Sequence, residues 1–509
     1  MFNDGPAFLA LTQALAAGDW ASALAHDYHP LYPFATLVLG LLTGATGDGY
    51  VSAAVAVSIL SGTVAVGCLY AFLRSAFGLP AAFLGALALA VHPYAVRFSS
   101  DVQSDGLYLA LFLAAVAFAW AALRDVRPAL AGWTGAFAGL AYLTRPEGIG
   151  VALASAGLAG LAALRGDGPR IRWLGWLAAL AGGLALVTAP YLVSLRLETG
   201  AWQLTKKKSV TRFAGLEAPP LATDAPQPAL APGAAAPAAA TAVGEPDAVR
   251  RAGRIGPVMV DFLRTVASGA RVELLLLLGL GLAASRGRPG PRAVFVGALV
   301  GLYACVLFAQ AYHYGYVSHR HVLPPLTLLF GWVALGVPVA GTALLRLAQR
   351  LRGAAASPRP RVALALGLAL LVVPSLGKGL RPTPETGVAE RRAAEWLRAQ
   401  GLPPGAVAAD KSRVAYYAGA PHVSLRAAPD TELVAWLQAQ GARYLIVGER
   451  VGSDPGGPAS PAKPSGSEPR ALRGARAAGL QVLHEVEAEG EAARVFAVPP
   501  TGGAAGEGR

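Results

Sequence analysis

Long runs without Asp, Glu, Lys or Arg limit the fold of this chain more than any other feature. Each is close to the roughly 20 mostly apolar residues that a helix needs to cross a bilayer. Nine runs are free of these charges, and a tenth, 265–285, carries Arg271 and Glu273 toward one end. Lipid offers the backbone no hydrogen bonds, so spanning segments must be helical or form closed barrels. The other nine runs are 50–73, 79–96, 106–123, 128–144, 148–164, 173–195, 293–318, 322–345 and 362–377.

An eleventh apolar run, 30–46, is short and opens with His29, Pro30 and Pro33. It either crosses the membrane or lies at the interface. The runs together predict an all-α polytopic membrane bundle of about 10–11 transmembrane helices.

The composition agrees with a chain that has lipid as its solvent. Only 14% of the residues are charged, against about 25% in soluble domains. The net charge is +13, but most Lys and Arg lie beside apolar runs, which indicates membrane orientation rather than binding to nucleic acid. The two cysteines, Cys68 and Cys305, both fall inside apolar runs, so no disulfide framework is expected.

Basic residues follow every second apolar run, and such loops are typically cytoplasmic. The other loops and the C-terminal region are then expected outside, which predicts a multi-pass protein of a bacterial inner membrane with a periplasmic C-terminal domain. The basic residues concerned are Arg74, Arg124, Arg127, Arg165, Arg170, Arg172, Arg286, Arg288, Arg292, Arg346, Arg350, Arg352, Arg359 and Arg361.

The N-terminal segment 1–29 contains Asp4, Asp19 and Asp27 but no Lys or Arg. The alternation of loops places it outside if 30–46 does not span. Two explanations stay open: a first helix precedes the given start, or 30–46 spans and the N-terminus is inside. The lack of basic residues favours the first.

The chain is expected to form two domains. Residues 1–380 form the membrane domain, with outer loops 1–29 and 197–263, and the Ala/Pro-rich middle of the second loop, 214–246, is expected to be disordered. Residues 385–500 are predicted to form a small soluble α/β domain. Its expected elements are helices over 389–399 and 431–440, strands over 406–409, 444–447 and 495–498, and a Gly/Pro/Ser linker over 453–469.

The C-terminal domain shows no Gly-rich phosphate loop, no metal-ligand spacing and no nucleophile elbow, so its simplest role is that of a lid or scaffold.

Polar residues beside the spans gather on the predicted outer face, which suggests one outward-facing polar cavity. Acidic groups there can serve as a general base or hold a divalent metal ion, and Arg or Lys can hold a phosphate. The residues are Asp4, His26, Asp27, His29, Arg97, Asp101, Asp105, Arg145, Glu147, Lys206, Lys207, Lys208, Arg212, His313, His319, Arg320 and His321.

Structural roles compete with these functional ones. Arg97, Arg212 and the run 206–208 would also serve as interfacial anchors with snorkelling side chains. Asp101 would also cap the helix that begins near Ser104. His26 and His29 are more simply structural than metal ligands, and Arg145 and Glu147 would pair with each other.

Five segments in this order resemble GT-C membrane glycosyltransferases, which include protein O-mannosyltransferases and lipid A aminoarabinose transferases. The most distinctive is Leu143-Thr144-Arg145-Pro146-Glu147-Gly148, which is similar to the family's Leu-Thr-Arg-Pro-Glu-Gly turn. The order and spacing agree from about residue 3 to 345. The other segments are Asn3-Asp4-Gly5, His29-Pro30-Leu31-Tyr32-Pro33, Ser99 to Leu107, and Ser318-His319-Arg320-His321-Val322-Leu323-Pro324.

The resemblance implies an active site on the outer face and a sugar donor linked to polyprenyl phosphate, with transfer by inversion. It carries the catalytic Asp over to Asp4 and the second acidic position to Asp105, with Asp101 as a rival. The candidates for the donor phosphate are Arg145, Arg320, Lys206, Lys207 and Arg97, and those for a divalent metal ion are Asp4, His29 and Asp105.

Two departures from the family stand out: Asp4 lacks the usual adjacent Glu, and no span precedes it in the given sequence.

The resulting hypothesis is a membrane glycosyltransferase that moves a sugar from a polyprenyl-phosphate-linked donor to a lipid, glycan or protein acceptor on the periplasmic face. One alternative is a transporter or flippase of lipid-linked sugars. That class predicts inverted repeats and midplane polar residues, and the sequence shows no repeat. The other alternative is a membrane-anchored binding protein whose C-terminal domain carries the function. It would leave the charges of the outer loops unexplained.

Overall fold

A computed structural model describes residues 4–206, 255–285, 290–351, 359–380 and 387–500, the last without 402, 404, 426, 427, 429–431 and 451–468. The chain divides into two compact units. The helical unit comprises Leu11–Ala222 and Gly244–Arg381, and the C-terminal unit comprises Met1–Ala10, Thr223–Val243 and Pro382–Arg509. The predicted disordered segment 214–246 and most of the predicted linker 453–469 lie outside the described residues.

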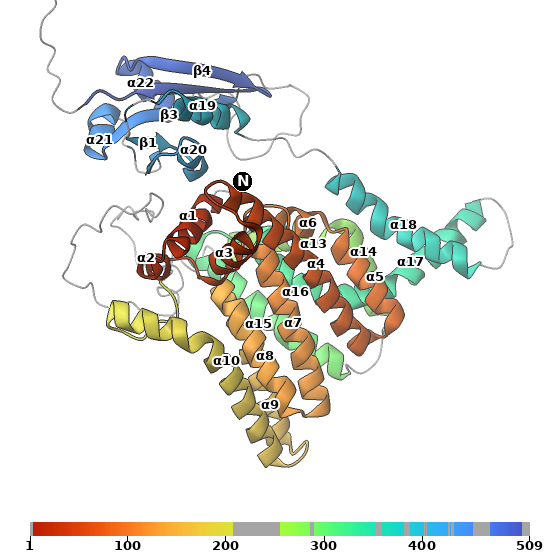
Figure 1. The fold of residues 1–509 in the computed structure, drawn as a ribbon. Coiled ribbons are helices and arrows are strands. Elements are labelled where there is room, and N and C mark those ends of the chain that lie inside the picture. The colour runs from red at the N-terminus through yellow and green to blue at the C-terminus, as the bar shows by residue number, and fades with distance from the viewer. Residues whose placement is uncertain are drawn as a thin grey trace, which may run out of the picture. The chain divides into compact units, whose positions relative to one another are not determined.

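The helical unit confirms the predicted all-α membrane bundle (Figure 1). Helix α1 begins in the residues that group with the C-terminal unit and ends in the helical unit. The helices up to the long outer loop are α1 (Gly5–Ala16), α2 (Trp20–Ala25), α3 (Leu31–Thr43), α4 (Gly49–Phe77), α5 (Leu79–Ala90), α6 (Pro93–Phe98), α7 (Asp105–Asp125), α8 (Pro128–Thr144), the 3-10 helix η1 (Pro146–Gly148), α9 (Ile149–Arg165) and α10 (Arg170–Thr199). After it come α13 (Ile255–Ala270), α14 (Val272–Ala284), α15 (Pro291–Tyr314), α16 (His319–Thr327), α17 (Phe330–Leu351) and α18 (Pro360–Gly379).

Within the described residues, fewer helices reach the length of a full span than the ten or eleven that the sequence predicts. Within the described residues, seven helices are long and apolar enough to cross a membrane, and an eighth is obtained if α13 and α14 form one broken span. Those two helices meet at 89°. The runs 79–96 and 30–46 each hold a helix of only 12 or 13 residues, because a turn ends the first at Val91 and Gly44 adopts a left-handed conformation after the second.

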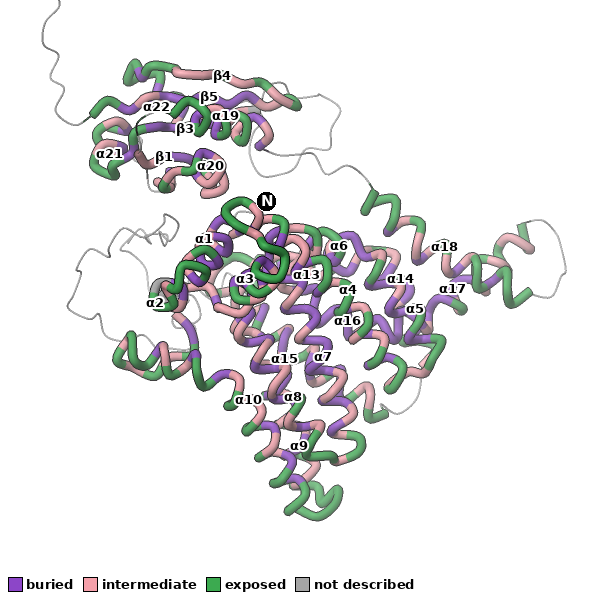
Figure 2. The backbone as a smooth tube through the Cα atoms, viewed as in Figure 1, coloured by how far each residue is buried: buried purple, intermediate pink, exposed green. Residues whose placement is uncertain are grey.

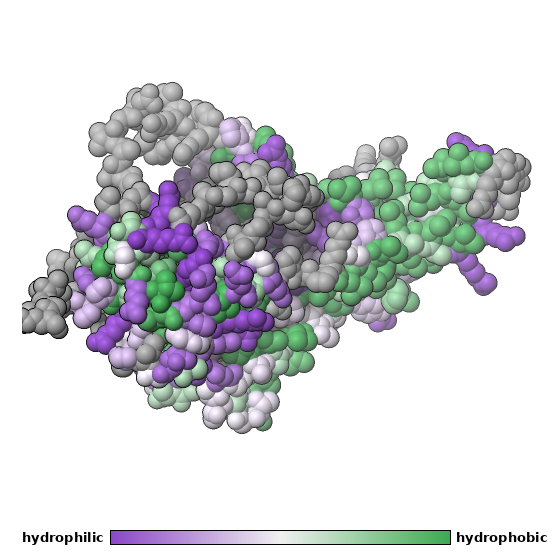
Figure 3. Space-filling model, turned by 90° about the horizontal axis from the view of Figure 1, so that it is seen from above, coloured by the Kyte–Doolittle hydropathy of each residue, from purple (hydrophilic) through white to green (hydrophobic). Residues whose placement is uncertain are grey.

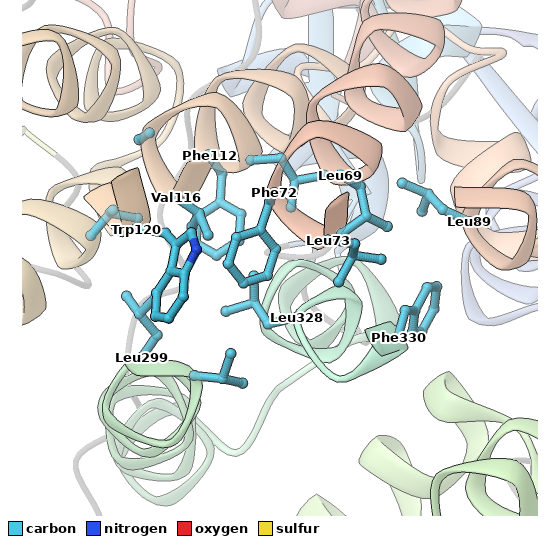
Figure 4. Close-up of a cluster of buried hydrophobic side chains, with 14 of the residues drawn as sticks. Leu69, Phe72, Leu73, Leu89, Phe112, Val116, Trp120, Leu299, Leu328 and Phe330 are labelled. Atoms are coloured by element: carbon cyan, nitrogen blue, oxygen red, sulfur yellow. The ribbon is translucent and has the colours of Figure 1, made fainter. Parts of the chain in front are cut away.

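Helix α7 lies at the centre of the bundle. Two-thirds of its most apolar window is buried, a larger share than for any other candidate span in the described chain, and Figure 2 shows it buried along most of its length. Its Phe112, Val116 and Trp120 face Leu69, Phe72 and Leu73 of α4, as well as Leu299 of α15 and Leu328 and Phe330 (Figure 4). This core sets the position of the N-terminal end of α7, where Asp105 stands.

Glycines let neighbouring helices approach closely. A Cβ on Gly135 of α8 would collide with the backbone of α10, and one on Gly336 of α17 would collide with the backbone of α14. Small residues at such crossings are typical of membrane helices, where van der Waals packing rather than the hydrophobic effect holds helices together.

Large apolar side chains cover much of the outside of the helical unit. On α17 and α18, Leu347, Leu351, Val373 and Leu376 are exposed, and Figure 3 shows a continuous hydrophobic surface along this part of the molecule. Exposed apolar area on this scale fits a surface that faces lipid.

The C-terminal unit holds a five-stranded sheet with the order β2-β1-β3-β5-β4. Strands β2, β1 and β3 run parallel, and β5 is antiparallel to both β3 and β4. Its elements are α19 (Val388–Ala399), β1 (Ala406–Ala409), α20 (Ser412–Tyr417), β2 (His422–Ser424), α21 (Leu433–Ala439), β3 (Ala442–Arg450), α22 (Arg470–Ala477), β4 (Val482–Ala488) and β5 (Glu491–Ala497).

Helices cover both faces of this sheet. Successive strand residues point to opposite faces, so neighbouring residues of one strand pack against different helices. Ile446 and Val495 pack with α19 and α20, whereas Leu445 and Phe496 pack with α21 and α22. The predicted α/β class of this region is therefore confirmed. The predicted boundaries, 1–380 and 385–500, stay a prediction.

Candidate functional site

The turn between α8 and α9 holds the most buried charge cluster of the helical unit in the described residues. Arg145 ends α8 in an extended conformation (φ −152°), and its amide donates to the Ala141 carbonyl at 2.8 Å. Pro146, Glu147 and Gly148 then form η1, whose Gly148 amide donates back to the Arg145 carbonyl at 2.9 Å. The sequence Arg-Pro-Glu-Gly thus presents two oppositely charged side chains within one tight turn.

Arg145 is held by carboxylates on two elements. Its Nη1 pairs with Oδ1 of Asp105, the first residue of α7, and its Nη2 lies 3.4 Å from Glu147 Oε1. The guanidinium also lies 5.5 Å from the centre of the Tyr108 ring, one turn further along α7. Arg145 and Asp105 are each only 7% exposed, so this ion pair is shielded from solvent.

The charge balance keeps Arg145 protonated. Burial alone would lower the pKa of its guanidinium, but the Glu147 and Asp105 carboxylates raise that pKa above its usual value. Arg145 is therefore a fixed cation that joins the start of α7 to the α8–α9 turn.

A hydrogen bond and a close backbone contact fix the position of the turn against α15 and α8. The Tyr303 hydroxyl of α15 donates to the Glu147 carbonyl at 2.8 Å. A Cβ on Gly148 would collide with the backbone of Ala141 and Tyr142, so only glycine lets the turn fold back so tightly onto α8.

A cavity of about 410 Å³ opens beside this turn. Its polar lining includes Glu147, Tyr303, Gln310, Arg320 and His321, and apolar side chains of α9 and α15 form much of the rest. An apolar pocket with a few convergent polar groups is the usual form of a ligand site. Among the described lining residues, Glu147 supplies the carboxylate and Arg320 the guanidinium.

The start of α16 shapes the polar end of the cavity. Ser318 and His321 form a capping box, with the His321 Nδ1 at 3.2 Å from the Ser318 amide. This cap holds Arg320 and His321 at the first turn of the helix, where both line the cavity.

His29 lies in a second, aromatic cluster of the helical unit. It is 3% exposed, its Nε2 is 3.1 Å from Thr205 Oγ1, and its ring meets the edge of Tyr142 at 5.1 Å. Lys206, next to Thr205, forms an ion pair with Glu198 at the end of α10. His29 thus ties the segment that follows α10 to α8, while Lys207 lies outside the described residues.

His26 lies close to the same cluster. Burial lowers the pKa of its ring, Asp27 raises it and Lys206 lowers it again. The ring is therefore mainly neutral at pH 7.

The remaining predicted site residues are not among the described residues that line the cavity. Asp4 directly precedes α1 and belongs to the residues that group with the C-terminal unit, so it is outside the unit that holds Asp105. Asp101 accepts a hydrogen bond from the Val102 amide at 2.7 Å within its own loop, whereas Ser104 is the residue before α7. Arg97 lies in the last turn of α6, and its charge lowers the pKa of the His319 ring.

The predicted metal ligands do not form a metal site among the residues that the structure describes. No group of three or more His, Cys, Asp or Glu side chains there is placed to hold an ion. Asp105 pairs with Arg145, and His29 contacts Thr205.

Sequence reasoning missed the contribution of α15. Tyr303, Val306, Gln310 and Tyr314 all line the cavity, and their spacing of three to four residues places them on one face of the helix. The run 293–318 is otherwise apolar, and polar side chains repeated on one face of it could have indicated that this helix lines a cavity.

Comparisons with known proteins identify the fold. Residues 28–193, less than half of the chain, match the model of the family described as dolichyl-phosphate-mannose-protein mannosyltransferase. This segment contains His29, Arg97, Asp101, Asp105 and Arg145. No curated protein matches the chain.

Three solved structures have a similar fold. ArnT from Cupriavidus metallidurans is 15% identical in its apo state, with a TM-score of 0.52 over 97% of this chain and 93% of that one. ArnT bound to undecaprenyl phosphate is 16% identical, with the same TM-score and coverage. The apo oligosaccharyltransferase of Archaeoglobus fulgidus is 13% identical, with a TM-score of 0.50 over 87% of this chain.

This chain spans 65% of the length of that archaeal enzyme. The family match and the shared fold confirm the resemblance to GT-C membrane glycosyltransferases, and with it the multi-pass membrane architecture.

Proposed function

We propose that this chain is a membrane glycosyltransferase that moves a sugar from a polyprenyl-phosphate-linked donor to an acceptor, with the donor head group in the cavity beside Glu147. The observation that carries the proposal is that Arg320 and Glu147 line the same apolar-walled cavity of a membrane helical bundle. A lipid-linked sugar needs this combination, because its phosphate is anionic, its sugar is rich in hydroxyl groups and its chain is apolar.

The cavity residues suit separate parts of such a donor. Arg320 would hold the phosphate by charge-assisted hydrogen bonds, and the Glu147 carboxylate would accept hydrogen bonds from sugar hydroxyls. Solved ArnT bound to undecaprenyl phosphate supports a lipid phosphate as the carrier on this fold. Arg145 and Asp105 would act through Glu147, as positioning residues that hold the turn.

The reaction is a displacement at the anomeric carbon of the sugar. An acceptor hydroxyl or amine attacks this carbon, the bond to the phosphate oxygen breaks, and polyprenyl phosphate leaves with the electron pair. A carboxylate takes the acceptor proton, and the resemblance assigns this role to Asp4. Arg320 stabilises the charge that grows on the departing phosphate, which is the kind of electrostatic contribution that most lowers such barriers.

The proposed setting is a bacterial inner membrane with the cavity on the periplasmic face. It is supported by the basic residues Arg74, Arg124 and Arg165 at the ends of α4, α7 and α9, which lie at the opposite ends of spans from the α8–α9 turn. Asp101, Lys206, Lys207 and Arg97 stay predictions as site residues, and so does a divalent metal ion.

The test is sugar release from a panel of radiolabelled polyprenyl-phosphate sugars by the purified chain. Arg320→Gln is expected to lower turnover by at least about a hundredfold, as the loss of a group that stabilises developing charge commonly does. Glu147→Gln is expected to lower turnover as well, because it weakens the hold on the sugar hydroxyls. Arg264→Gln on α13 is the matched control, because Arg264 is exposed and pairs only loosely with Asp261, at 3.5 Å.

Other outcomes separate the alternatives. Turnover that Arg320→Gln and Arg264→Gln lower equally would refute the assignment of the cavity. Transport of the intact labelled lipid across a vesicle membrane, without sugar release, would indicate a flippase. An Asp4→Asn variant with full turnover would remove Asp4 as the base.

A further inference from the structure

A second group of cations lies at the break between α13 and α14, apart from the residues that line the cavity. We define the Tyr94 cluster as Tyr94 and Arg97 of α6, Ser268 of α13, Arg271 at the break, His319 at the start of α16 and Lys378 in the last turn of α18. Three of its members carry fixed positive charges, and they come from three separate parts of the chain.

Tyr94 connects the members of the cluster. The Lys378 ammonium lies 3.3 Å from the Tyr94 hydroxyl and 4.8 Å from the centre of its ring. The His319 ring stacks on Tyr94 at 4.3 Å with an interplanar angle of 16°, and its Nε2 is 2.8 Å from Ser268 Oγ. These contacts place a hydroxyl, an imidazole and an ammonium within one small area.

The electrostatics of the cluster are one-sided. Burial lowers the pKa of the His319 ring, and the two charges that lower it further are those of Lys378 and Arg97. Glu273 is the carboxylate close by, and it is already engaged with Arg271 Nε. Cations held together in this way repel each other, and a bound anion would relieve that cost.

One buried group of the cluster retains unused hydrogen-bonding capacity. The Arg271 side chain is 10% exposed and donates through Nη2 to the Pro374 carbonyl at 3.0 Å, while its Nη1 has no partner. A buried donor left without a partner is costly, so an additional ligand would satisfy a need that the chain itself leaves open.

The backbone at the break is strained in the same place. Arg271 has φ = +68°, in a region that residues other than glycine rarely adopt. Such strain persists only where the surroundings hold it, and it is concentrated at ligand sites. Here it directs the Arg271 guanidinium toward α18, where Nη2 donates to the Pro374 carbonyl.

The depth of the cluster indicates the kind of anion. Lys378 ends one candidate span, α18, and Arg271 precedes α14, the apolar half of the broken span. The cluster therefore lies where apolar helices end, which is the level of lipid head groups. Val96 of α6 and Leu376 and Leu380 near Lys378 are exposed and apolar, so a lipid chain would find an apolar surface below.

We propose that the Tyr94 cluster binds the phosphate group of a membrane lipid, at a site separate from the cavity beside Glu147. Lys378 and Arg97 supply the exposed charges, the Tyr94 and Ser268 hydroxyls supply further hydrogen bonds, and Arg271 Nη1 supplies the buried donor. The same phosphate chemistry belongs to two sources, an anionic glycerophospholipid and a polyprenyl phosphate. The site goes beyond the transfer reaction, and its occupancy is measured without turnover.

The test is native mass spectrometry of the full chain in a neutral detergent, titrated with phosphatidylglycerol in one arm and with a polyprenyl phosphate in the other. The Arg97→Gln/Lys378→Gln variant is expected to bind the preferred lipid about tenfold more weakly, because two charge-assisted contacts are lost. Arg264→Gln, which removes an exposed charge from α13, is expected to bind like the parent. Lys378→Arg is expected to retain binding, since it keeps the cation.

The outcomes are decisive in either direction. A selective loss in the Arg97→Gln/Lys378→Gln variant supports the site, and the arm in which it occurs names the source of the phosphate. Equal affinity in the parent and that variant, in both arms, would overturn the proposal. An equal loss in Arg264→Gln would also overturn it, because it would indicate general charge attraction. The Lys378→Arg result guards against a folding defect, since a correctly folded chain with a cation at this position must bind.

Discussion

The Tyr303 hydroxyl donates a hydrogen bond of 2.8 Å to the Glu147 carbonyl, although the two residues are 156 positions apart. This bond pins α15 to the turn between α8 and α9. The Tyr303 ring packs against Phe112 in a T-shaped contact, with the ring centres 5.4 Å apart. The core of the bundle therefore sets the position of the carboxylate that lines the cavity.

Replacing Tyr303 by Phe should weaken catalysis while leaving the bundle folded. One hydrogen bond is worth about 1 kcal/mol, or about fivefold. We expect a fall of this size in kcat with little change in KM for the donor, because the change loosens the turn without removing a binding group. Tyr70→Phe on α4 is a matched control. Steady-state kinetics would contradict the prediction if the two variants behaved alike.

The effects of Arg145 and Asp105 on the stability of the fold should depend on each other, because the two side chains form a buried ion pair. Removing one partner leaves a buried charge uncompensated, which costs about 3–5 kcal/mol. We expect Arg145→Gln and Asp105→Asn each to lower the midpoint of thermal unfolding in detergent. The double variant should be less destabilised than the sum of the two single variants, because no isolated charge remains. A strictly additive result would show that the two groups do not interact.

The helical architecture could be predicted from the sequence, because lipid restricts apolar runs to one conformation. The ends of the individual helices could not. Nothing in the run 79–96 shows that its helix ends at Ala90, and the 89° break at Arg271 depends on contacts with Pro374, more than a hundred residues away. Those stops are set by tertiary packing rather than by local hydrophobicity.

The same division holds for the candidate site. The Arg-Pro-Glu-Gly motif and the alternation of loops placed Arg145 and Asp105 on one face of the membrane, and the structure brings them into contact. The contribution of Tyr303 depends on how α15 packs against α9, which periodicity does not report. In the C-terminal unit, β4 escaped prediction because this edge strand carries His484, Glu485 and Glu487, and an exposed edge does not need an apolar pattern.

The core of the C-terminal unit should be sensitive to truncation of Leu445. This side chain is fully buried in β3 between α21 and α22. A Leu→Ala change at such a site costs about 2–5 kcal/mol through lost burial and the cavity left behind. We expect Leu445→Ala to speed proteolysis within 387–500 in the full chain, whereas Val482→Ala on the exposed edge should have little effect. Equal cleavage of the two variants would contradict the assigned packing.

His29 should act as a clamp on the start of the long outer loop. Its Nε2 contacts Thr205, which is 1% exposed, and its ring packs against Tyr142 and Tyr191. His29→Ala removes both contacts, so the loop should open more often. Because proteases cut locally opened segments, we expect tryptic cleavage after Lys206 to accelerate about tenfold, which corresponds to about 1.4 kcal/mol.

The control for this experiment is Trp202→Ala, which changes a large but 70% exposed side chain in the same segment. It removes bulk without removing a buried contact, so cleavage after Lys206 should stay at the parental rate. If Trp202→Ala accelerated cleavage as much as His29→Ala, the loop would be sensitive to any local change. The proposed role of His29 in holding the loop would then be refuted. If neither variant changed the rate, the ion pair of Lys206 with Glu198 would suffice to hold the loop.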